Sequence, residues 1–175
     1  LERKELTREQ VLVGRFATLF DRLGVQADAA QCAQLYGENL SQGHFFLPGA
    51  KEALETLSRK YRLYLVSNGT AKVQQGRLRS ANISHLFEDI FISQTLGANK
   101  PDKAFFDAVF MRIPDFTLNE SMIVGDSLTS DILGGINAGI ATCWVNPSHK
   151  PCSPDVQPDY QIESLAKLPA LLESL

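Results

Sequence analysis

Short apolar runs alternate with amphipathic helical stretches over most of this sequence. The predicted strands are 63–66, 90–92, 122–124 and 142–145. The predicted helices are 49–60, 70–80, a segment that opens at Pro101, a segment around 132–136, and 162–174. Buried strands that alternate with helices of this length predict an α/β fold, in which helices cover both faces of a parallel sheet.

The amino-terminal part of the chain has a different character. Apolar residues between positions 7 and 40 recur with the 3.6-residue period of a helix, and Leu47-Pro48-Gly49 interrupts that pattern. We expect residues 1–47 to form a separate helical unit and residues 48–175 to form the α/β unit. The chain opens with Leu1 in helix-prone sequence, and we expect no capping residue on the first helix.

Composition and charge exclude several classes of protein. Apolar residues make up 44% of the chain and charged residues 21%, which is typical of a globular protein, and no apolar run is long enough to cross a membrane. The net charge is −3 and the sequence has no cluster of basic residues, so the chain is a poor candidate for binding nucleic acid. The three cysteines lack a Cys-x-x-Cys spacing, which favours reduced thiols in a cytoplasmic protein. We expect a monomer or a weak homodimer.

Polar segments follow three of the predicted strands. They are Ser67-Asn68-Gly69-Thr70, Asn99-Lys100-Pro101 and Gly125-Asp126-Ser127. Ligands of open α/β sheets bind beyond the carboxyl ends of the strands, so these segments should face the same edge. The Ser67 hydroxyl and the backbone N–H groups after it suit a phosphate oxygen at a helix start. A plain helix cap is the alternative for Ser67.

Lys100 carries a positive charge to a predicted helix start. A residue before proline adopts extended backbone, and Pro101 suits the first position of a helix. A cation is unfavourable there because of the helix dipole, so we expect an anion beside Lys100. That anion is either a ligand phosphate or a neighbouring carboxylate. The alternative is a solvated surface lysine.

Two aspartates follow the third polar strand end. Asp126 lies at the tip of a strand and Asp131 in the first turn of the next helix, so both can face one crevice. Two carboxylates beside a phosphate site suit Mg²⁺. The alternative for Asp131 is complementation of the helix dipole. For Asp126 a purely structural role is less favoured, because an unpaired carboxylate at a buried strand end is energetically costly. Gly134-Gly135 in the same helix predicts close packing of helix and sheet.

These three segments resemble motifs of a known superfamily. Ser67-Asn68-Gly69, then Lys100-Pro101, then Gly125-Asp126 with Asp131 resemble the second, third and fourth motifs of haloacid dehalogenase-like (HAD) hydrolases in order and spacing. The resemblance implies a Rossmann-like α/β core with an α-helical cap, of which residues 1–47 resemble the later part. The runs 74–78 and 130–139 are most similar to pyrimidine 5′-nucleotidases, which act on pyrimidine nucleoside monophosphates.

The resemblance also implies roles for the site residues. Ser67 would donate a hydrogen bond to the transferring phosphoryl group, with the backbone N–H of Asn68 beside it, and Lys100 would neutralise the phosphate and the nucleophile. Asp126 would bind Mg²⁺, and Asp131 would hold that ligand or a metal-bound water. The implied activity is Mg²⁺-dependent hydrolysis of a small-molecule phosphate ester, in which electrostatics stabilises a charge-rich transition state.

One motif of the superfamily is absent from the sequence. No Asp-x-Asp occurs, although that motif supplies the nucleophile and the acid/base from the end of a central strand. Its loss would leave neighbouring strands without backbone partners. We therefore expect the chain to be a carboxyl-terminal portion of a longer enzyme and to be inactive alone.

Two other functions stay open at this stage. One is a haloacid dehalogenase, which splits carbon–halogen bonds without a metal. The other is a non-catalytic protein that keeps the phosphate site as a scaffold. For the substrate, Phe45 or Phe46 could stack on a base, or both could simply pack at the junction between the two units.

Overall fold

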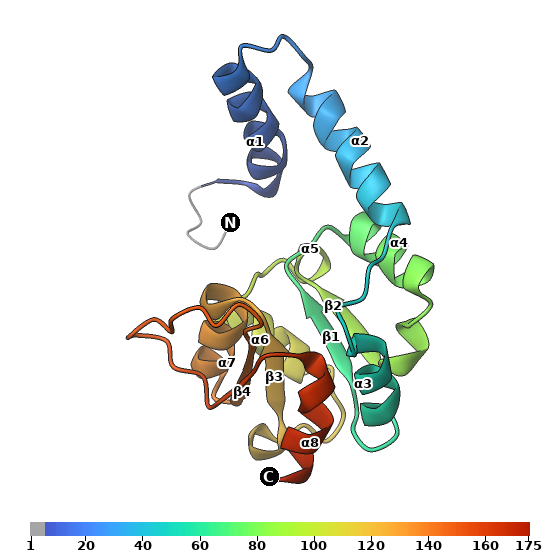
Figure 1. The fold of residues 1–175 in the computed structure, drawn as a ribbon, viewed down its shortest axis with the longest axis vertical. Helices are drawn as coiled ribbons and strands as arrows, with labels where there is room; N and C mark the ends of the chain where they lie inside the picture. The colour runs from blue at the N-terminus through green and yellow to red at the C-terminus, as the bar shows by residue number, and fades with distance from the viewer. Residues whose placement is uncertain (1–5) are drawn as a thin grey trace.

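The computed structural model describes residues 6–175 as a pair of helices beside an α/β unit (Figure 1). The helical pair consists of α1 (Arg8–Leu23) and α2 (Ala29–Gln42). The helix-prone residues 1–5 lie outside the described part. No helix within residues 6–175 combines the length and the apolar character that crossing a bilayer requires.

Helix α1 has an amino-terminal cap, so the expectation of an uncapped first helix is wrong. The Thr7 hydroxyl accepts a hydrogen bond from the Gln10 backbone N–H, and the Gln10 side chain accepts one from the Thr7 N–H. This reciprocal pair is a capping box, which satisfies two donors that the helix itself leaves free. The Thr-x-x-Gln spacing at positions 7 and 10 is the sequence signature of this capping box. The helix-prone residues before Thr7 obscure it, because they place the start of the helix further upstream.

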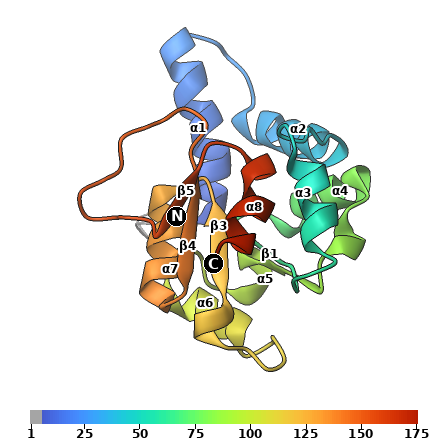
Figure 2. The ribbon, with the colours of Figure 1, turned by 60° about the horizontal axis from the view of Figure 1, so that its bottom comes forward.

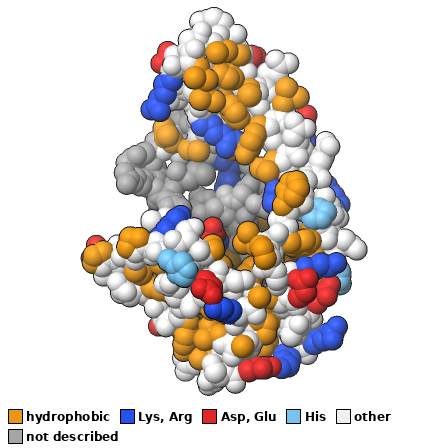
Figure 3. All heavy atoms as spheres, viewed as in Figure 1, with side chains coloured by type: hydrophobic (Ala, Val, Ile, Leu, Met, Phe, Trp, Pro, Cys, Tyr) orange, Lys and Arg blue, Asp and Glu red, His pale blue; other side chains and the backbone are white. Residues whose placement is uncertain are grey.

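The helical pair has little buried surface of its own. The Phe16 and Tyr36 rings meet edge to face at 5.7 Å, with the Arg15 guanidinium over both. Neither helix holds a fully buried residue. Hydrophobic side chains gather on the face of the helical pair seen in Figure 3. The exposed large hydrophobic residues of α1, α2 and the loop between them are Leu19, Leu23, Val25, Leu35, Tyr36 and Leu40.

The α/β unit contains five parallel strands, as the predicted fold class requires. The strands are β1 (Tyr64–Ser67), β2 (Asp89–Ile92), β3 (Met122–Gly125), β4 (Ala141–Val145) and β5 (Tyr160–Ile162). The helices are α3 (Ala50–Leu57), α4 (Ala71–Ala81), α5 (Ser93–Leu96), α6 (Lys103–Phe110), α7 (Leu133–Ala138) and α8 (Leu168–Glu173). Between β3 and α7 lies a π-helical turn, η3 (Leu128–Ile132). The shorter turns η1 (Ser84–Leu86), η2 (Leu118–Glu120) and η4 (Leu165–Lys167) complete the order.

Several elements differ from the sequence prediction. The helix predicted over 162–174 begins only at Leu168, after β5 and the turn η4, and the short helix α5 was not predicted. Strand β5 was not predicted, because three residues are too short to show a period and Ile162 continues into apolar helical sequence; its pairing with β4 determines the strand. Helix α6 begins at Lys103 and not at Pro101, because Asp102 has extended backbone and serves as the N-cap.

The strands form two sheets and not one. Among the described residues, β1 pairs only with β2, and β3 pairs only with β4, in the orders β1-β2 and β3-β4-β5. Figures 1 and 2 show β1 and β3 as the neighbouring edges of these two sheets. All four residues of β1 keep some exposure. The two facing edges match the expectation that the absence of a central strand leaves its neighbours without backbone partners.

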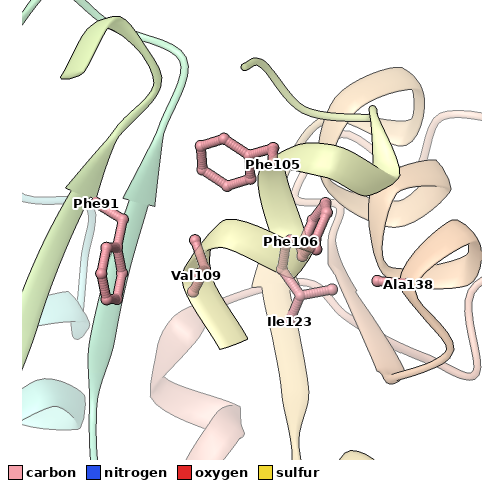
Figure 4. Packing of buried hydrophobic residues seen from close by; sticks show 6 residues of the cluster. All are labelled: Phe91, Phe105, Phe106, Val109, Ile123 and Ala138. Carbon is pink, nitrogen blue, oxygen red and sulfur yellow. The ribbon is translucent and has the colours of Figure 1, made fainter. Parts of the chain in front are cut away.

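Helix α6 joins the two sheets through its side chains. Its Phe105, Phe106 and Val109 are buried in one cluster with Phe91 of β2 and Ile123 of β3. Figure 4 shows Phe105 and Val109 on the side of α6 that faces β2, and Phe106 on the other side. Burying a large apolar side chain contributes about 1.5–3 kcal/mol. This cluster therefore fixes the relative position of the two sheets, which no backbone hydrogen bond between them does within residues 6–175.

Helices α3 and α8 pack on the face of β4 and β5 that lies opposite α7, because their side chains meet Cys143 and Val145 whereas Gly135 of α7 meets Thr142. Leu57 of α3 and Leu168 of α8 pack in one cluster with Cys143, Val145 and Ile162. Helices therefore lie on both faces of the sheet, as predicted. Burial in this cluster raises the pKa of the Cys143 thiol to about 11.

This burial makes Cys143 unreactive in the folded protein. At pH 8 only about one thousandth of a thiol with that pKa is the reactive thiolate, whereas the free cysteines Cys32 and Cys152 are partly exposed. We predict that a disulfide reagent at pH 8 modifies Cys32 and Cys152 in the native state and Cys143 only after denaturation, as localised by peptide mass spectrometry. Rapid native modification of Cys143 would contradict this packing.

The Gly134-Gly135 pair packs closely, as the sequence predicts. A Cβ atom on Gly135 would lie 2.5 Å from Ile123 Cγ2 and 2.6 Å from Thr142 Cγ2, and one on Gly134 would lie 2.7 Å from the Phe106 ring. Real Cβ atoms do not approach this closely, so Gly135 lets α7 lie directly on the sheet and Gly134 lets it lie against α6.

Replacing Gly135 therefore tests this packing. We predict that Gly135→Ala lowers the free energy of unfolding by about 1–3 kcal/mol through overpacking, measured by urea denaturation. Gly14→Ala in α1 is the matched control, because the added Cβ would meet nothing within 4 Å. This change should raise the free energy of unfolding by about 0.5–1 kcal/mol. Equal stabilisation by both changes would show that α7 and the sheet do not pack in this way.

Candidate functional site

The polar segments that follow β1, β2 and β3 meet at one edge of the α/β unit. The Lys100 ammonium donates to the Val66 carbonyl of β1 at 3.0 Å and to Asp131 Oδ1 at 2.6 Å. The second oxygen of Asp131 accepts from the Ser127 backbone N–H, which directly follows Asp126, at 3.1 Å. A continuous set of bonds thus runs from the end of β1, through Lys100 and Asp131, to the loop after β3.

Lys100 and Asp131 form a buried ion pair. The two residues are 6% and 7% exposed, so neither charge is solvated. The predicted anion beside Lys100 is therefore a neighbouring carboxylate, and the alternative of a surface lysine is wrong. A buried charge is tolerated only with a partner and further hydrogen bonds, and here Val66 and Ser127 supply them.

Asn68 fixes the backbone of Lys100. The Asn68 side-chain amide donates to the Lys100 carbonyl, and its oxygen accepts from the Lys100 N–H, both at 2.9 Å. The Lys100-Pro101 peptide bond is cis. The resemblance implies only a backbone N–H role for Asn68, and the side-chain bonds to Lys100 are visible only in the structure. They link the segment after β1 to the segment that carries the buried ammonium.

Ser67 is not the cap of the following helix. The N-cap of α4 is Thr70, which makes no side-chain capping bond. The Ser67 hydroxyl oxygen accepts from the Gly69 N–H at 3.1 Å. Among residues 6–175 no group accepts the hydroxyl proton, so Ser67 keeps a donor for a ligand at this edge.

Within residues 6–175, the carboxylate of Asp126 has no hydrogen-bond or ion-pair partner. The backbone carbonyl of Asp126 accepts from the Trp144 indole N–H at 3.0 Å, which fixes the loop, while the residue itself is exposed. The expected cost of burying an unpaired carboxylate therefore does not arise. Within the described chain no three side chains of metal-ligand type cluster. Mg²⁺ needs only one or two carboxylates and takes waters and phosphate oxygens besides, so this donor set fits it.

Arg8 is a site residue that the sequence analysis missed. From the first position of α1, one terminal nitrogen donates to the Asn68 and Gly69 carbonyls, both at 2.9 Å. The other donates to Ser93 Oγ at 2.7 Å and to Asn99 Oδ1 at 3.0 Å. Partial burial lowers the pKa of this guanidinium, yet an arginine stays protonated in proteins.

A pattern in the sequence could have revealed Arg8. The Thr7–Gln10 capping box places Arg8 at the start of a helix, where a cation is unfavourable beside the helix dipole. The same argument predicted a partner for Lys100. Applied to Arg8, it would have required acceptors from elsewhere in the fold.

The aromatic residues between the two units are only partly explained. Phe45 is 91% exposed, so it does not pack at the junction as one alternative supposed. Phe46 meets the His44 ring edge to face at 5.5 Å, and His44 Nδ1 lies 2.8 Å from Ser80 Oγ. Stacking of either phenylalanine on a base stays a prediction.

Comparison with known proteins identifies the family. A sequence model described as haloacid dehalogenase-like hydrolase matches residues 6–145. The chain belongs to the haloacid dehalogenase-like hydrolases. This HAD chain is 41% identical over 167 residues to HAD-hydrolase YfnB of Bacillus subtilis, covering 95% of this chain and 71% of YfnB.

Two further relatives are named as nucleotidases. Identity is 37% over 169 residues with pyrimidine 5′-nucleotidase PynA of Streptococcus pneumoniae, covering 96% of this chain and 71% of PynA. It is 32% over 167 residues with pyrimidine 5′-nucleotidase YjjG of Escherichia coli, covering 95% and 73%. The crystal structure of YfnB bound to magnesium matches with a TM-score of 0.93 at 41% identity, covering 98% of this chain and 75% of that chain.

The buried ion pair gives a stability prediction. Asp131→Asn leaves the Lys100 ammonium buried without its carboxylate, and we predict that the free energy of unfolding falls by about 3 kcal/mol or more in urea denaturation. The control is Asp107→Asn, which breaks the exposed Lys103–Asp107 pair and should cost less than about 1 kcal/mol. Equal losses for the two variants would mean that the Lys100 charge is solvated.

Proposed function

We propose that this chain supplies the phosphate site and the metal carboxylate of a Mg²⁺-dependent phosphomonoester hydrolase, a 5′-nucleotidase for pyrimidine nucleoside monophosphates. The observation that carries the proposal is the buried Lys100 ammonium, which lies between the Ser67 and Asp126 loops. The relatives named as pyrimidine 5′-nucleotidases support the substrate class. We also propose a cytoplasmic location, which the free thiols support.

Each residue of the site has a separate role in binding a phosphoryl group. The Ser67 hydroxyl and the Asn68 backbone N–H donate hydrogen bonds to its oxygens. The Lys100 charge offsets the negative charge that gathers there. Because these donors are held by packing and hydrogen bonds before the ligand arrives, they stabilise the transition state with little reorganisation.

Mg²⁺ would be held by the free carboxylate of Asp126, with waters and phosphate oxygens in its other positions. When bound, the ion supplies positive charge that polarises the phosphoryl oxygens. Asp131 orients the loop that carries Asp126, through the bond from the Ser127 N–H, and it neutralises Lys100 when no ligand is bound.

The nucleophile is the part of this proposal that the chain itself does not contain. We propose that an acidic strand lies between β1 and β3, where both edges face each other, and places an Asp-x-Asp beside Lys100. One carboxylate oxygen attacks phosphorus, the ester bond breaks, and the second acid gives its proton to the leaving oxygen. Water then hydrolyses the phospho-aspartate. The helical pair α1–α2 would be part of the cap over this site.

The two alternatives are less well supported. Gly125-Asp126 with a second acid at Asp131 favours the metal-dependent phosphatase over a haloacid dehalogenase, because two carboxylates beside a phosphate site suit Mg²⁺. A purely structural protein has no need of an unused hydroxyl donor on Ser67 or of a buried cation at the strand ends.

The proposed activity can be tested with two forms of the chain. The first is the 175-residue chain, and the second is the same chain extended at its amino terminus by the Asp-x-Asp strand of a HAD relative. We predict that only the extended form releases phosphate from uridine or cytidine monophosphate with Mg²⁺. We predict that EDTA abolishes this activity and that Ser67→Ala lowers it about 10²-fold.

Each alternative gives a distinct result. Equal activity of the two forms would show that the nucleophile does not come from the added strand. Activity on a 2-haloacid that survives EDTA would favour the dehalogenase. Binding of phosphate without turnover by the extended form would favour the non-catalytic protein.

A further inference from the structure

Two sets of contacts tie the helical pair to the α/β unit. The first lies at the carboxyl end of α2, which packs on α4: a Cβ on Gly76 would meet the Ser41 carbonyl at 2.5 Å, and Ser80 Oγ donates to the Gln42 carbonyl at 2.8 Å. The second is the guanidinium of Arg8 at the amino end of α1. The first set lies beside the connection between the two units, and the second lies at the site.

All four acceptors of Arg8 belong to segments of the phosphate site or border them. The Asn68 and Gly69 carbonyls lie in the loop that follows Ser67, where we propose that phosphate binds. Ser93 begins α5 directly after β2, and Asn99 precedes Lys100. One side chain on the helical pair therefore holds three separate segments of the α/β unit together.

The acceptors are all neutral. Within residues 6–175, no acidic side chain pairs with Arg8, and its four terminal N–H donors are used on two carbonyls, a hydroxyl and an amide. This arrangement needs the planar fork of an arginine, because a lysine ammonium has three donors on a single nitrogen and cannot span the same acceptors.

We propose that Arg8 is a positioning residue that latches the amino end of cap helix α1 onto the loops of the phosphate site, and so sets the closed position of the cap. The α2–α4 contact then acts as the fixed end and the Arg8 latch as the releasable end. The part of this inference that concerns phosphate and the cap role rests on the proposed function; the part that concerns the position of the helical pair does not.

The latch couples cap position to ligand affinity. Moving the amino end of α1 away breaks four hydrogen bonds and frees the Asn68 loop and the segment before Lys100. A phosphate that orders those loops therefore favours the closed cap, and a closed cap favours phosphate to the same degree.

The cap position can be measured on the native chain. Spin labels are attached to Cys32 in α2 and to Cys152 in the α/β unit, while the buried Cys143 stays unlabelled. Pulsed electron paramagnetic resonance then measures the distance between the two labels. We expect a narrow distance distribution in the wild type and a broad one, with added longer distances, in Arg8→Gln. Arg8→Lys should lie between them, because it keeps the charge but not the fork.

Matched variants distinguish loss of the Arg8 hydrogen bonds from a general effect of lost charge or of impaired folding. Arg22→Gln removes the same charge from the last turn of the same helix, where the residue is exposed, and should leave the distribution unchanged. Ser93→Ala removes one acceptor from the other side of the latch and should broaden it less than Arg8→Gln. A distribution in Arg8→Gln equal to that of the wild type overturns the proposal.

Binding of inorganic phosphate with Mg²⁺, followed by calorimetry, provides the second readout. We expect Arg8→Gln to weaken it about 10-fold and Arg22→Gln to leave it unchanged. Weaker binding with an unmoved cap would overturn the latch, because Arg8 would then act on the loop alone. If the wild type binds no phosphate, the proposed function fails, and the distance measurement still decides the role of Arg8.

Discussion

The buried pair of Lys100 and Asp131 is the interaction on which the site depends. An ammonium in this position is tolerated because a carboxylate and the Val66 carbonyl surround it. The same contacts bring the ends of β1 and β3 to one place, although no backbone bonds join the two sheets in the described chain. The buried charge of Lys100, which we propose contacts the phosphate, thus also helps to hold the fold together at this edge.

The hydrophobic core also holds the two sheets together, beneath the loops of the site. Helix α6 packs on Phe91 of β2 and on Ile123 of β3, so its apolar side chains determine how the two sheets lie. Gly135 then lets α7 approach the sheet closely, and Gly134 lets it pack against α6. The loops at the carboxyl ends therefore rest on a packed frame, which is what a site of preorganised donors requires.

Much of this arrangement could be predicted from local patterns. The alternation of strands and helices gave the parallel α/β fold, and the strand-end rule placed Ser67, Lys100 and Asp126 at one edge. Features set by tertiary contacts could not be predicted in this way. Strand β5 is defined by its pairing with β4, the Asn68 side chain by its bonds to Lys100, and Arg8 by acceptors about 60–90 positions away along the chain.

A crystal structure of the chain with Mg²⁺ and tungstate, a heavy-atom analogue of phosphate, would locate both proposed ligands. We predict tungstate within hydrogen-bond distance, about 2.7–3.2 Å, of Ser67 Oγ and of the Lys100 ammonium. We also predict Mg²⁺ on the Asp126 carboxylate. Tungstate bound away from Ser67 and Lys100, or Mg²⁺ bound away from Asp126, would contradict the account.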